Sequence, residues 1–247
     1  MEHPEHPVVV KGLRKAFGSQ TVLNGIDLTV ARGETLAIMG RSGTGKSILL
    51  KLLIRLQQSD AGSIRIHGRE IGELDLAELN EIRKKVGFLF QQAALYDSLT
   101  VEENVAFPMT RHTTLSPAER KDRVRELLAS VGMERDLAKM PSQISGGMQK
   151  RVGLARALAL DPEILLFDEP TAGLDPITAG EIDRLILELK ERRKITSLVA
   201  THDIHGARSF SDRVVMLNEG NVLIEGSFED VRRSQDEFVT RFLSEAA

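Results

Sequence analysis

The 247-residue sequence has no cysteine and no excess of positive charge, and each absence excludes a class of protein. Without cysteine, the chain forms no disulfide bond and binds no metal through thiolates, which suits a reducing compartment. A formal net charge of −3 provides no overall basic field of the kind that attracts nucleic acid. We therefore expect no nucleic acid partner.

The sequence also lacks long apolar runs. Residues 48–54 are interrupted by Lys51 and fall far short of the roughly 18 apolar residues that a membrane span needs. Residues 1–7 are acidic and contain prolines instead of a cationic, apolar leader, so we expect no signal peptide. These features predict a soluble, cytoplasmic protein. If it acts at a membrane, a partner must supply the spans.

A glycine-rich motif stands near the start of the chain. Residues 40–47 read Gly-Arg-Ser-Gly-Thr-Gly-Lys-Ser and match G-x-x-x-x-G-K-[ST], the phosphate-binding loop. The apolar residues 36–39 before it predict a buried strand, and residues 48–56 after it predict a helix. A chance glycine-rich turn is the alternative, but this strand–loop–helix order is the context that the motif requires.

The motif has a physical basis in anion binding. Glycines let successive backbone N–H groups face one concavity, and the positive end of the following helix dipole favours an anion there. Lys46 would reach the β- and γ-phosphates of a nucleotide, and the Ser47 hydroxyl would bind Mg²⁺. The predicted nucleotide-binding residues of this loop are Gly40, Arg41, Ser42, Gly43, Thr44, Gly45, Lys46 and Ser47.

Two strands, at 8–12 and 22–30, are predicted before the loop. The second alternates apolar and polar residues, which indicates a half-exposed antiparallel strand. Phe17 lies between them and could stack on adenine, because a base offers a π-face. The alternative is an ordinary phenylalanine of the core.

A second α/β segment follows the first helix. Residues 62–68 predict a short strand, and residues 75–85 predict a helix capped by Asp75 and Glu78. A buried strand is predicted at 86–90, with Gln91 just after its end. Residues at that position line the ligand crevice of open α/β sheets, so Gln91 could contact Mg²⁺ or water, although a single glutamine is a weak signal.

Helices dominate from about residue 93 to residue 160. Ser116, Pro117 and Glu119 form a typical helix start, and this helix is predicted to reach Ser130. Another helix is predicted over residues 145–160. Because this block interrupts an α/β chain, we interpret it as an insertion.

Two adjacent acids end the next predicted strand. Residues 164–167 are apolar and predict a central parallel strand, which Asp168 and Glu169 follow. Placing charged carboxylates at the end of an apolar strand costs free energy unless they have partners. Asp168 would hold Mg²⁺, directly or through water, and Glu169 would orient or deprotonate the water that attacks the γ-phosphate. Two solvated acids at the start of a loop are the alternative.

The remaining α/β elements bring a histidine to another strand end. Residues 178–190 predict a helix and 195–200 a buried strand, after which His202 could contact the γ-phosphate or support Glu169. A structural histidine is the alternative. His205 lies nearby, but the pair lacks the acidic or thiolate ligands that a metal site needs.

The chain ends with a predicted hairpin and a tail. Residues 213–217 and 221–224 predict its two strands, around a Glu-Gly turn. From Phe228 the chain is charged and helical with an apolar edge. It could pack on its own domain or support a partner subunit.

Taken in order, these motifs resemble those of the ATP-binding subunit of ABC transporters, over about residues 8–224. The matching segments are the phosphate loop, Gln91, 145–147, 168–169, 173–175 and 201–203. The resemblance implies a P-loop NTPase (RecA-like) α/β core with an antiparallel β subdomain and an inserted α-helical subdomain. It divides a single ATPase domain into a core at about 8–91 and 161–227, an insertion at about 92–160 and a helical tail at about 228–247.

The same resemblance assigns roles and implies ATP and Mg²⁺ as cofactors. Phe17 would stack on adenine, and Gln91 would be the Q-loop residue, in reach of Mg²⁺. Glu169 would be the catalytic carboxylate, Asp175 the D-loop acid and His202 the switch histidine.

In this family a signature segment contacts the nucleotide held by the other subunit, which implies a homodimer with two ATP molecules between its subunits. Here the signature residues are Ser145, Gly146, Gly147 and Met148. A helix start behind Ser-Gly-Gly is an anion site on physical grounds. Met148 replaces the family's usual glutamine, so one polar contact is lost while Ser145 and the backbone N–H groups remain.

Met148 and short strings at 91–95, 103–108 and 175–178 resemble the Mla/Mce-type lipid-transport branch of the family. This implies an ATPase that powers transport of phospholipid or another hydrophobic substrate at the cytoplasmic face of the inner membrane. The partners would be integral membrane permease subunits, contacted around 96–108, with a Mce-domain substrate-binding protein and a small accessory subunit.

Three alternatives remain beside the lipid transporter. The first is an ABC importer ATPase for a polar small molecule. The second is a soluble ABC-type ATPase acting on DNA or ribosomes, which the negative charge and the absence of a heptad run disfavour. The third is a simple P-loop kinase, in which residues 145–147 and His202 would have no role.

Overall fold

The computed structural model describes residues 5–244 and contains two sheets in that range. The larger has the strand order β10-β9-β3-β8-β7-β6, and the smaller has the order β2-β1-β4-β5. The strands of the larger sheet are β3 (Thr35–Met39), β6 (Val86–Leu89), β7 (Ile164–Asp168), β8 (Thr196–Thr201), β9 (Arg213–Asn218) and β10 (Asn221–Gly226). Those of the smaller sheet are β1 (Val8–Phe17), β2 (Gln20–Val30), β4 (Ala61–Ile66) and β5 (Arg69–Glu70).

The pairing of several strands agrees with their burial. The strands β3, β7 and β8 are buried at every position and pair in parallel, as the apolar run at 164–167 predicted. β10 lies at the sheet edge with alternating burial, pairs antiparallel with β9 and forms the predicted hairpin. The strand β2 also pairs antiparallel, with β1, as its alternation predicted.

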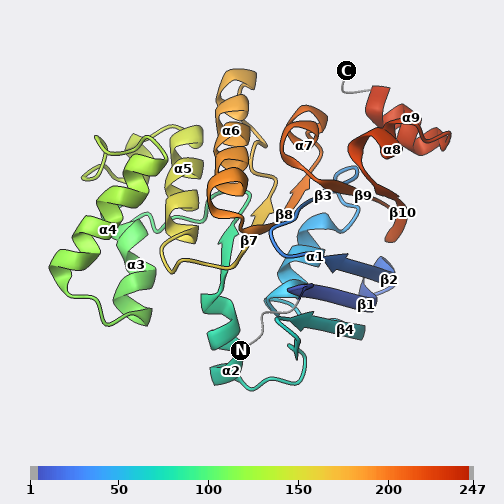
Figure 1. Cartoon of the computed structure of the whole chain (residues 1–247), viewed down its shortest axis with the longest axis horizontal. Helices are drawn as coiled ribbons and strands as arrows, with labels where there is room; N and C mark the ends of the chain where they lie inside the picture. Colours follow the sequence, from blue (N-terminus) through green and yellow to red (C-terminus); the bar gives the residue numbers. More distant parts are fainter. Residues whose placement is uncertain (1–4, 245–247) are drawn as a thin grey trace.

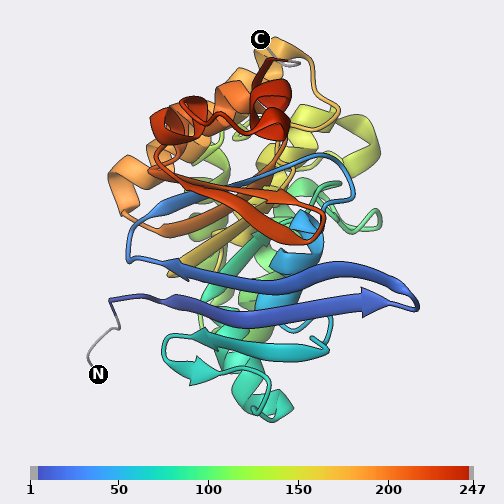
Figure 2. The same ribbon diagram turned by 90° about the vertical axis from the view of Figure 1, so that its right-hand side faces the viewer.

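The helix α1 (Lys46–Leu53) lies between the two sheets (Figures 1 and 2). Its apolar residues share a buried cluster with one face of each sheet. Leu36 and Ile38 of β3 join that cluster, whereas Ala37 and Met39 point to the opposite face. The phosphate loop joins β3 to α1, so both of its ends continue into buried elements.

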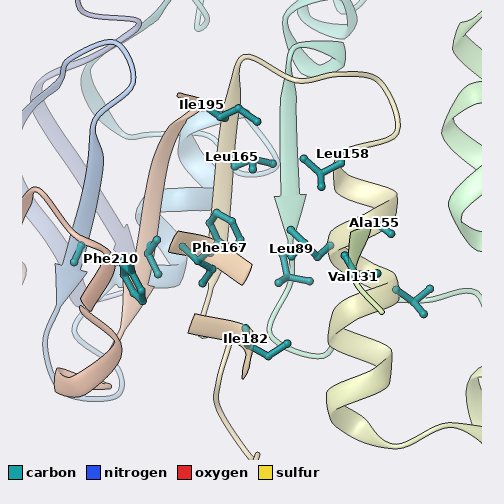
Figure 3. Close-up of a cluster of buried hydrophobic side chains, with 14 of the residues drawn as sticks. Leu89, Val131, Ala155, Leu158, Leu165, Phe167, Ile182, Ile195 and Phe210 are labelled. Carbon is teal, nitrogen blue, oxygen red and sulfur yellow. The ribbon is translucent and has the colours of Figure 1, made fainter. Parts of the chain in front are cut away.

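The other face of the larger sheet is covered by helices. They are α5 (Gly146–Ala157), α6 (Pro176–Arg193), α7 (Ile204–Phe210) and α8 (Phe228–Arg232), while α9 (Glu237–Ser244) packs on α8, and α3 (Val101–His112) and α4 (Pro117–Ser130) pack on α5. Figure 3 shows Leu165 and Phe167 of β7 in one cluster with Leu158, which follows α5, and Ile182 of α6. The apolar core therefore continues from the sheet into the helical block, which occupies one side of Figure 1. The division into core, insertion and tail stays a prediction.

Capping residues set the helix boundaries. The Ser116 hydroxyl accepts a hydrogen bond from the backbone of Glu119, and α4 ends at Ser130 as predicted. Asp75 and Glu78 form the predicted capping box of α2 (Leu76–Lys84).

Several predicted boundaries were wrong. The first helix begins at Lys46 instead of Ile48 and ends at Leu53, shortly before Arg55 takes a left-handed conformation (φ +50°). His67, also at φ +50°, ends β4 before residue 68 and begins the turn to β5. The strand β1 runs on to Phe17, and the short helix α7 was not predicted.

The tail packs on its own domain. Val239 and Phe242 of α9 are buried in the same core as the larger sheet. Residues 1–4 of the opening segment and residues 245–247 of the tail lie outside the described residues. Among the helices of residues 5–244, none combines the length and the apolarity that crossing a bilayer requires.

Candidate active site

The predicted site residues meet at one edge of the larger sheet. The strands β3, β8 and β7 are parallel neighbours, so their carboxyl ends lie side by side. The phosphate loop follows β3, and Asp168 ends β7 with Glu169 next to it. His202 follows β8. Segments far apart in the sequence therefore meet at this edge.

Two glycines of the phosphate loop have no acceptable replacement. Gly40 has φ +150°, and a Cβ there would lie 2.5 Å from the carbonyl oxygen of Leu217. Gly45 precedes α1 with φ +97°, and a Cβ there would lie 2.7 Å from Leu23 Cδ2. The loop keeps its tight course because both positions lack a side chain.

Lys46 is a buried cation whose hydrogen bonds fold it over the loop. Its Nζ donates to the carbonyl oxygens of Gly40 at 2.7 Å and Arg41 at 3.0 Å. It also forms an ion pair with Glu169, with 3.2 Å between Nζ and Oε1. The lysine side chain is 4% exposed, so these contacts offset the cost of its desolvation.

Ser47 and Asp168 bring two oxygens together. The Ser47 hydroxyl donates to Asp168 Oδ1 at 2.5 Å, and Asp168 is 3% exposed. Oxygen ligands suit Mg²⁺, which proteins commonly hold with one or two side chains beside the substrate phosphates. Within residues 5–244, no cluster of three or more His, Asp or Glu side chains is arranged for a metal. The pair therefore fits a magnesium ion that is bound together with a nucleotide.

Glu169 is held from several directions at the end of β7. Its Oε2 lies 2.7 Å from Nδ1 of His202 and accepts from the His202 backbone N–H at 3.3 Å. Glu169 has φ +48°, although it is not glycine, and its own N–H donates to the carbonyl oxygen of Ala200 at 2.8 Å. Such left-handed strain costs about 1–3 kcal/mol and is common at functional sites.

Phe17 and Gln91 are both exposed. Phe17 is 47% exposed at the end of β1, with Lys15 Nζ 5.1 Å from the ring centroid, so the alternative of a core phenylalanine is wrong. The Gln91 side chain is exposed, and its backbone carbonyl accepts a hydrogen bond from Lys150.

The segment 145–148 belongs to a different group of side chains. The Ser145 hydroxyl caps α5 by accepting from the Met148 N–H at 3.3 Å. A Cβ on Gly146 would lie 3.7 Å from Leu174, and one on Gly147 would overlap Cγ2 of Thr178. The start of α5 therefore lies against the start of α6, and β7 separates α5 from α1 in Figure 1.

Asp175 caps α6 in that second group. It accepts from the backbone N–H groups of Ile177 and Thr178, both at 3.1 Å, and from the Thr178 hydroxyl at 2.6 Å. These hydrogen bonds, that of the hydroxyl first, lower the pKa of the Asp175 carboxyl. Asp175 thus fixes Thr178, against which Gly147 rests.

The family model of ABC transporters matches residues 23–172, from β2 through the phosphate loop to just beyond Glu169. The chain belongs to the ABC transporter family. The chain accordingly contains an ABC ATPase domain.

Curated relatives agree with the assignment. The chain is 43% identical to the probable ribonucleotide transport ATP-binding protein mkl of Mycobacterium tuberculosis, over 96% of this chain and 66% of that protein. It is 42% identical to the methionine import ATP-binding protein MetN of Brucella abortus, over 89% of this chain and 60% of that protein. The chain therefore spans less than two thirds of the length of these two relatives.

Solved structures of the family share the fold. The ATP-binding cassette MJ0796, in a dimeric post-hydrolysis state with ADP and phosphate, superposes with a TM-score of 0.83 at 38% identity. That match covers 90% of this chain and 98% of the other. The cbiO1 protein of Clostridium perfringens, part of an ABC transporter complex, gives a TM-score of 0.84 at 30% identity, over 98% and 96% of the two chains.

The sequence reasoning missed two cations of this ABC ATPase domain. Lys150 is 5% exposed and donates to the carbonyl oxygens of Gln91 and Glu169. Burial lowers the pKa of Lys150 to about 8, partly opposed by the charges of Asp168 and Glu169. Arg156, further along α5, donates to the carbonyls of residues 93 and 94. The burial of Lys150 and the partial burial of Arg156 could not be predicted from a glycine-rich helix with weak periodicity.

A further contact joins the tail to the phosphate loop of the ABC ATPase domain. The Arg41 guanidinium lies 5.6 Å from the centroid of the Phe238 ring in α9. This is within the range of a cation–π interaction. The C-terminal helix therefore reaches the phosphate loop as well as the core.

Proposed function

We propose that two copies of this chain bind two Mg·ATP at their interface and couple ATP hydrolysis to a membrane permease. The strongest support is the convergence of Lys46, Ser47, Asp168, Glu169 and His202 at one sheet edge. A phosphate-binding lysine, a pair of oxygens suited to Mg²⁺ and a carboxylate next to a histidine are the groups that ATP hydrolysis requires.

The phosphate loop binds the nucleotide in this proposal. Its backbone N–H groups and Lys46 hold the phosphates, and the exposed ring of Phe17 stacks on adenine. Ser47, Asp168 and the exposed Gln91 hold Mg²⁺, which neutralises phosphate charge when bound. The loop residues that take part are Gly40, Arg41, Ser42, Gly43, Thr44, Gly45, Lys46 and Ser47.

Glu169 activates the water. Its carboxylate orients the attacking water and accepts its proton, a contribution that is typically worth about 10²–10⁴-fold. His202, at 2.7 Å, holds the carboxylate in place and contacts the γ-phosphate. The ion pair with Lys46 ties this group to the phosphate loop.

A second copy completes each site. The segment 145–148 starts α5 with an exposed serine cap but packs beside α6, on the far side of β7 from α1. A partner related by a two-fold axis can present this segment to the nucleotide on the first copy. Asp175 lies beside it and contacts the same partner. Nucleotide favours the closed dimer because it contacts both subunits only there.

The permease docks on an apolar surface near the edge strand β6. A cavity of about 470 Å³ lies there, beside the Tyr96 and Phe107 rings, whose centroids are 4.6 Å apart. A largely apolar groove with one exposed aromatic wall, Tyr96, and one half-buried aromatic wall, Phe107, suits an apolar segment of a partner. Its apolar lining includes Val86, Phe88, Phe90, Tyr96, Phe107 and Pro108.

The proposed cargo is phospholipid or another hydrophobic compound, moved at the cytoplasmic face of the inner membrane. Met148 and the strings shared with the Mla/Mce-type branch support it, and they suggest a Mce-domain protein and a small accessory subunit as further partners. A polar small molecule is the second candidate, because the names of the two relatives refer to ribonucleotide transport and methionine import.

Purification from native membranes tests the transporter and its cargo. The tagged protein is extracted in detergent, and the copurifying proteins and lipids are identified by mass spectrometry. A permease with a Mce-domain protein and bound phospholipid supports the lipid assignment. A permease with a binding protein for a polar solute keeps the transporter and overturns the lipid cargo. Absence of any permease in several detergents contradicts the coupling.

A further inference from the structure

Lys150 is a buried ammonium whose acceptors lie outside its own helix. It is 5% exposed on α5, the helix that starts at the segment 145–148. Burying such a charge is costly unless acceptors surround it. Its Nζ donates to the carbonyl oxygen of Gln91 and, at 3.1 Å, to that of Glu169. One cation therefore ties three functional segments together.

The same face of α5 holds the chain just after Gln91. Gly153 lies one turn from Lys150, and a Cβ there would lie 2.8 Å from Leu89 and 3.1 Å from Ala93. Arg156, one turn further, donates to the carbonyls of Ala93 at 2.6 Å and Ala94 at 2.7 Å.

The segment that this face holds is strained. Ala93 has φ +56° and Ala94 has φ +49°, a left-handed conformation that costs free energy in residues other than glycine. It persists because the surrounding contacts over-determine it, and those from Lys150 and Arg156 come from a single helix. The position of Gln91 is therefore coupled to the position of α5.

We propose that Lys150 is a positioning residue for ATP hydrolysis. Through the two backbone carbonyls it holds Gln91 and Glu169 in a fixed relation to α5 and its segment 145–148. The inference rests on the proposed ATP hydrolysis at Glu169. Both acceptors of Lys150 are backbone carbonyl oxygens, so Lys150 fixes the backbone positions from which the Gln91 and Glu169 side chains extend. The phosphate loop stays unchanged when Lys150 is replaced. A misplacement of about 1 Å at such a group costs roughly 100-fold in rate.

The test compares two substitutions at this position. Lys150→Met keeps the length and removes every donor, whereas Lys150→Gln keeps a neutral donor that can reach a carbonyl. Lys190→Met is the matched control, because Lys190 also donates to a backbone carbonyl, that of Phe210, away from the site. For each purified protein we would measure kcat, KM for ATP, binding of a fluorescent ATP analogue and the melting temperature.

We expect Lys150→Met to lower kcat by roughly 10- to 100-fold while KM and analogue binding stay within about threefold. Lys150→Gln should recover part of that loss, and Lys190→Met should keep the wild-type kcat. If Lys150→Met does not fold, the test compares Lys150→Gln with Lys190→Met. A lower kcat for Lys150→Gln then supports the inference.

Two results overturn the inference while the proposed function stands. One is an unchanged kcat for Lys150→Met when the wild-type protein hydrolyses ATP. The other is an equal loss of kcat, analogue binding and melting temperature that Lys150→Gln does not relieve, which indicates a purely structural lysine. An inactive wild-type protein that still binds the analogue overturns the proposed hydrolysis itself.

Discussion

The carboxylate of Glu169 forms an ion pair with Lys46, with 3.2 Å between Oε1 and Nζ. The residue proposed to activate water is thus tied to the residue proposed to bind phosphate. Both are almost fully buried, with side-chain exposures of 9% and 4%. A change at Glu169 is expected to affect the activation of water, and a change at Lys46 is expected to affect phosphate binding in the same reaction.

Glu169→Gln should abolish hydrolysis and retain ATP binding. The amide keeps the size of the side chain but cannot accept the proton of the attacking water. We expect kcat to fall by about 10²–10⁴-fold, measured as phosphate release at saturating Mg·ATP. Glu188→Gln, at a partly exposed position of α6, is the control with wild-type activity. A wild-type rate in Glu169→Gln would refute the assignment of the base.

Lys46→Ala should weaken ATP binding. A hydrogen bond to a charged group is worth about 1.5–3 kcal/mol, so the dissociation constant should rise by roughly 10- to 100-fold. Equilibrium binding of labelled ATP measures this change. Lys51→Ala, on the same helix but outside the loop, should bind ATP like the wild type. Equal affinities of all three proteins would mean that the nucleotide binds elsewhere.

Gly147→Ala should destabilise the protein, and Gly146→Ala should not. A Cβ at residue 147 would overlap the Thr178 methyl group, while one at residue 146 has ordinary contact with Leu174. The Thr178 side chain cannot easily rotate away, because its hydroxyl is bonded to Asp175 at 2.6 Å. Overpacking of this kind costs about 1–3 kcal/mol, which denaturant unfolding can measure.

A second substitution checks the cause of that loss. Thr178→Ser keeps the hydroxyl and removes the methyl group, so it should restore the stability of Gly147→Ala. If the double variant is as unstable as the single one, the overlap with Thr178 is not the reason.

Asp183→Asn should raise stability in neutral and alkaline solution. Burial and the charge of Asp203 raise the pKa of Asp183 to about 7, and its Oδ1 is buried without a hydrogen-bond partner among residues 5–244. Between about pH 4 and pH 7 the folded state therefore binds more protons than the unfolded state, and stability falls as the pH rises. The amide carries no charge and removes this loss.

Calorimetry from pH 5 to pH 8 measures the effect. The melting temperature of Asp183→Asn should exceed that of the wild type at pH 8, and the difference should shrink as the pH is lowered. Asp122→Asn, at an exposed position of α4, should follow the wild-type curve. Parallel curves for Asp183→Asn and the wild type would contradict the buried, protonated carboxyl.

Much of the fold and the site could be predicted because the signals are local. The phosphate loop is contiguous, and the apolar runs that became β3, β7 and β8 have the length and burial of parallel strands. The carboxyl ends of parallel strands meet at one edge, so the proximity of Ser47, Asp168 and His202 followed from their order.

Contacts between distant segments could not be predicted in the same way. The sequence pattern indicates a surface position for Lys150 in a polar helix. Its burial comes from the distant segments of Gln91 and Glu169, whose carbonyl oxygens accept its hydrogen bonds. The contact of Arg41 with Phe238 joins opposite ends of the chain and leaves no periodic signal. The helix α7 was missed because it is short and begins directly after the motif at 201–203.

The central claim is that ATP binds between two copies of this chain. The most direct measurement is light scattering of purified Glu169→Gln with and without Mg·ATP, combined with the nucleotide content of the eluted peak. We predict a particle of two chains that carries two ATP molecules, formed only with nucleotide. A single chain that holds ATP and stays monomeric at saturating nucleotide would contradict the account.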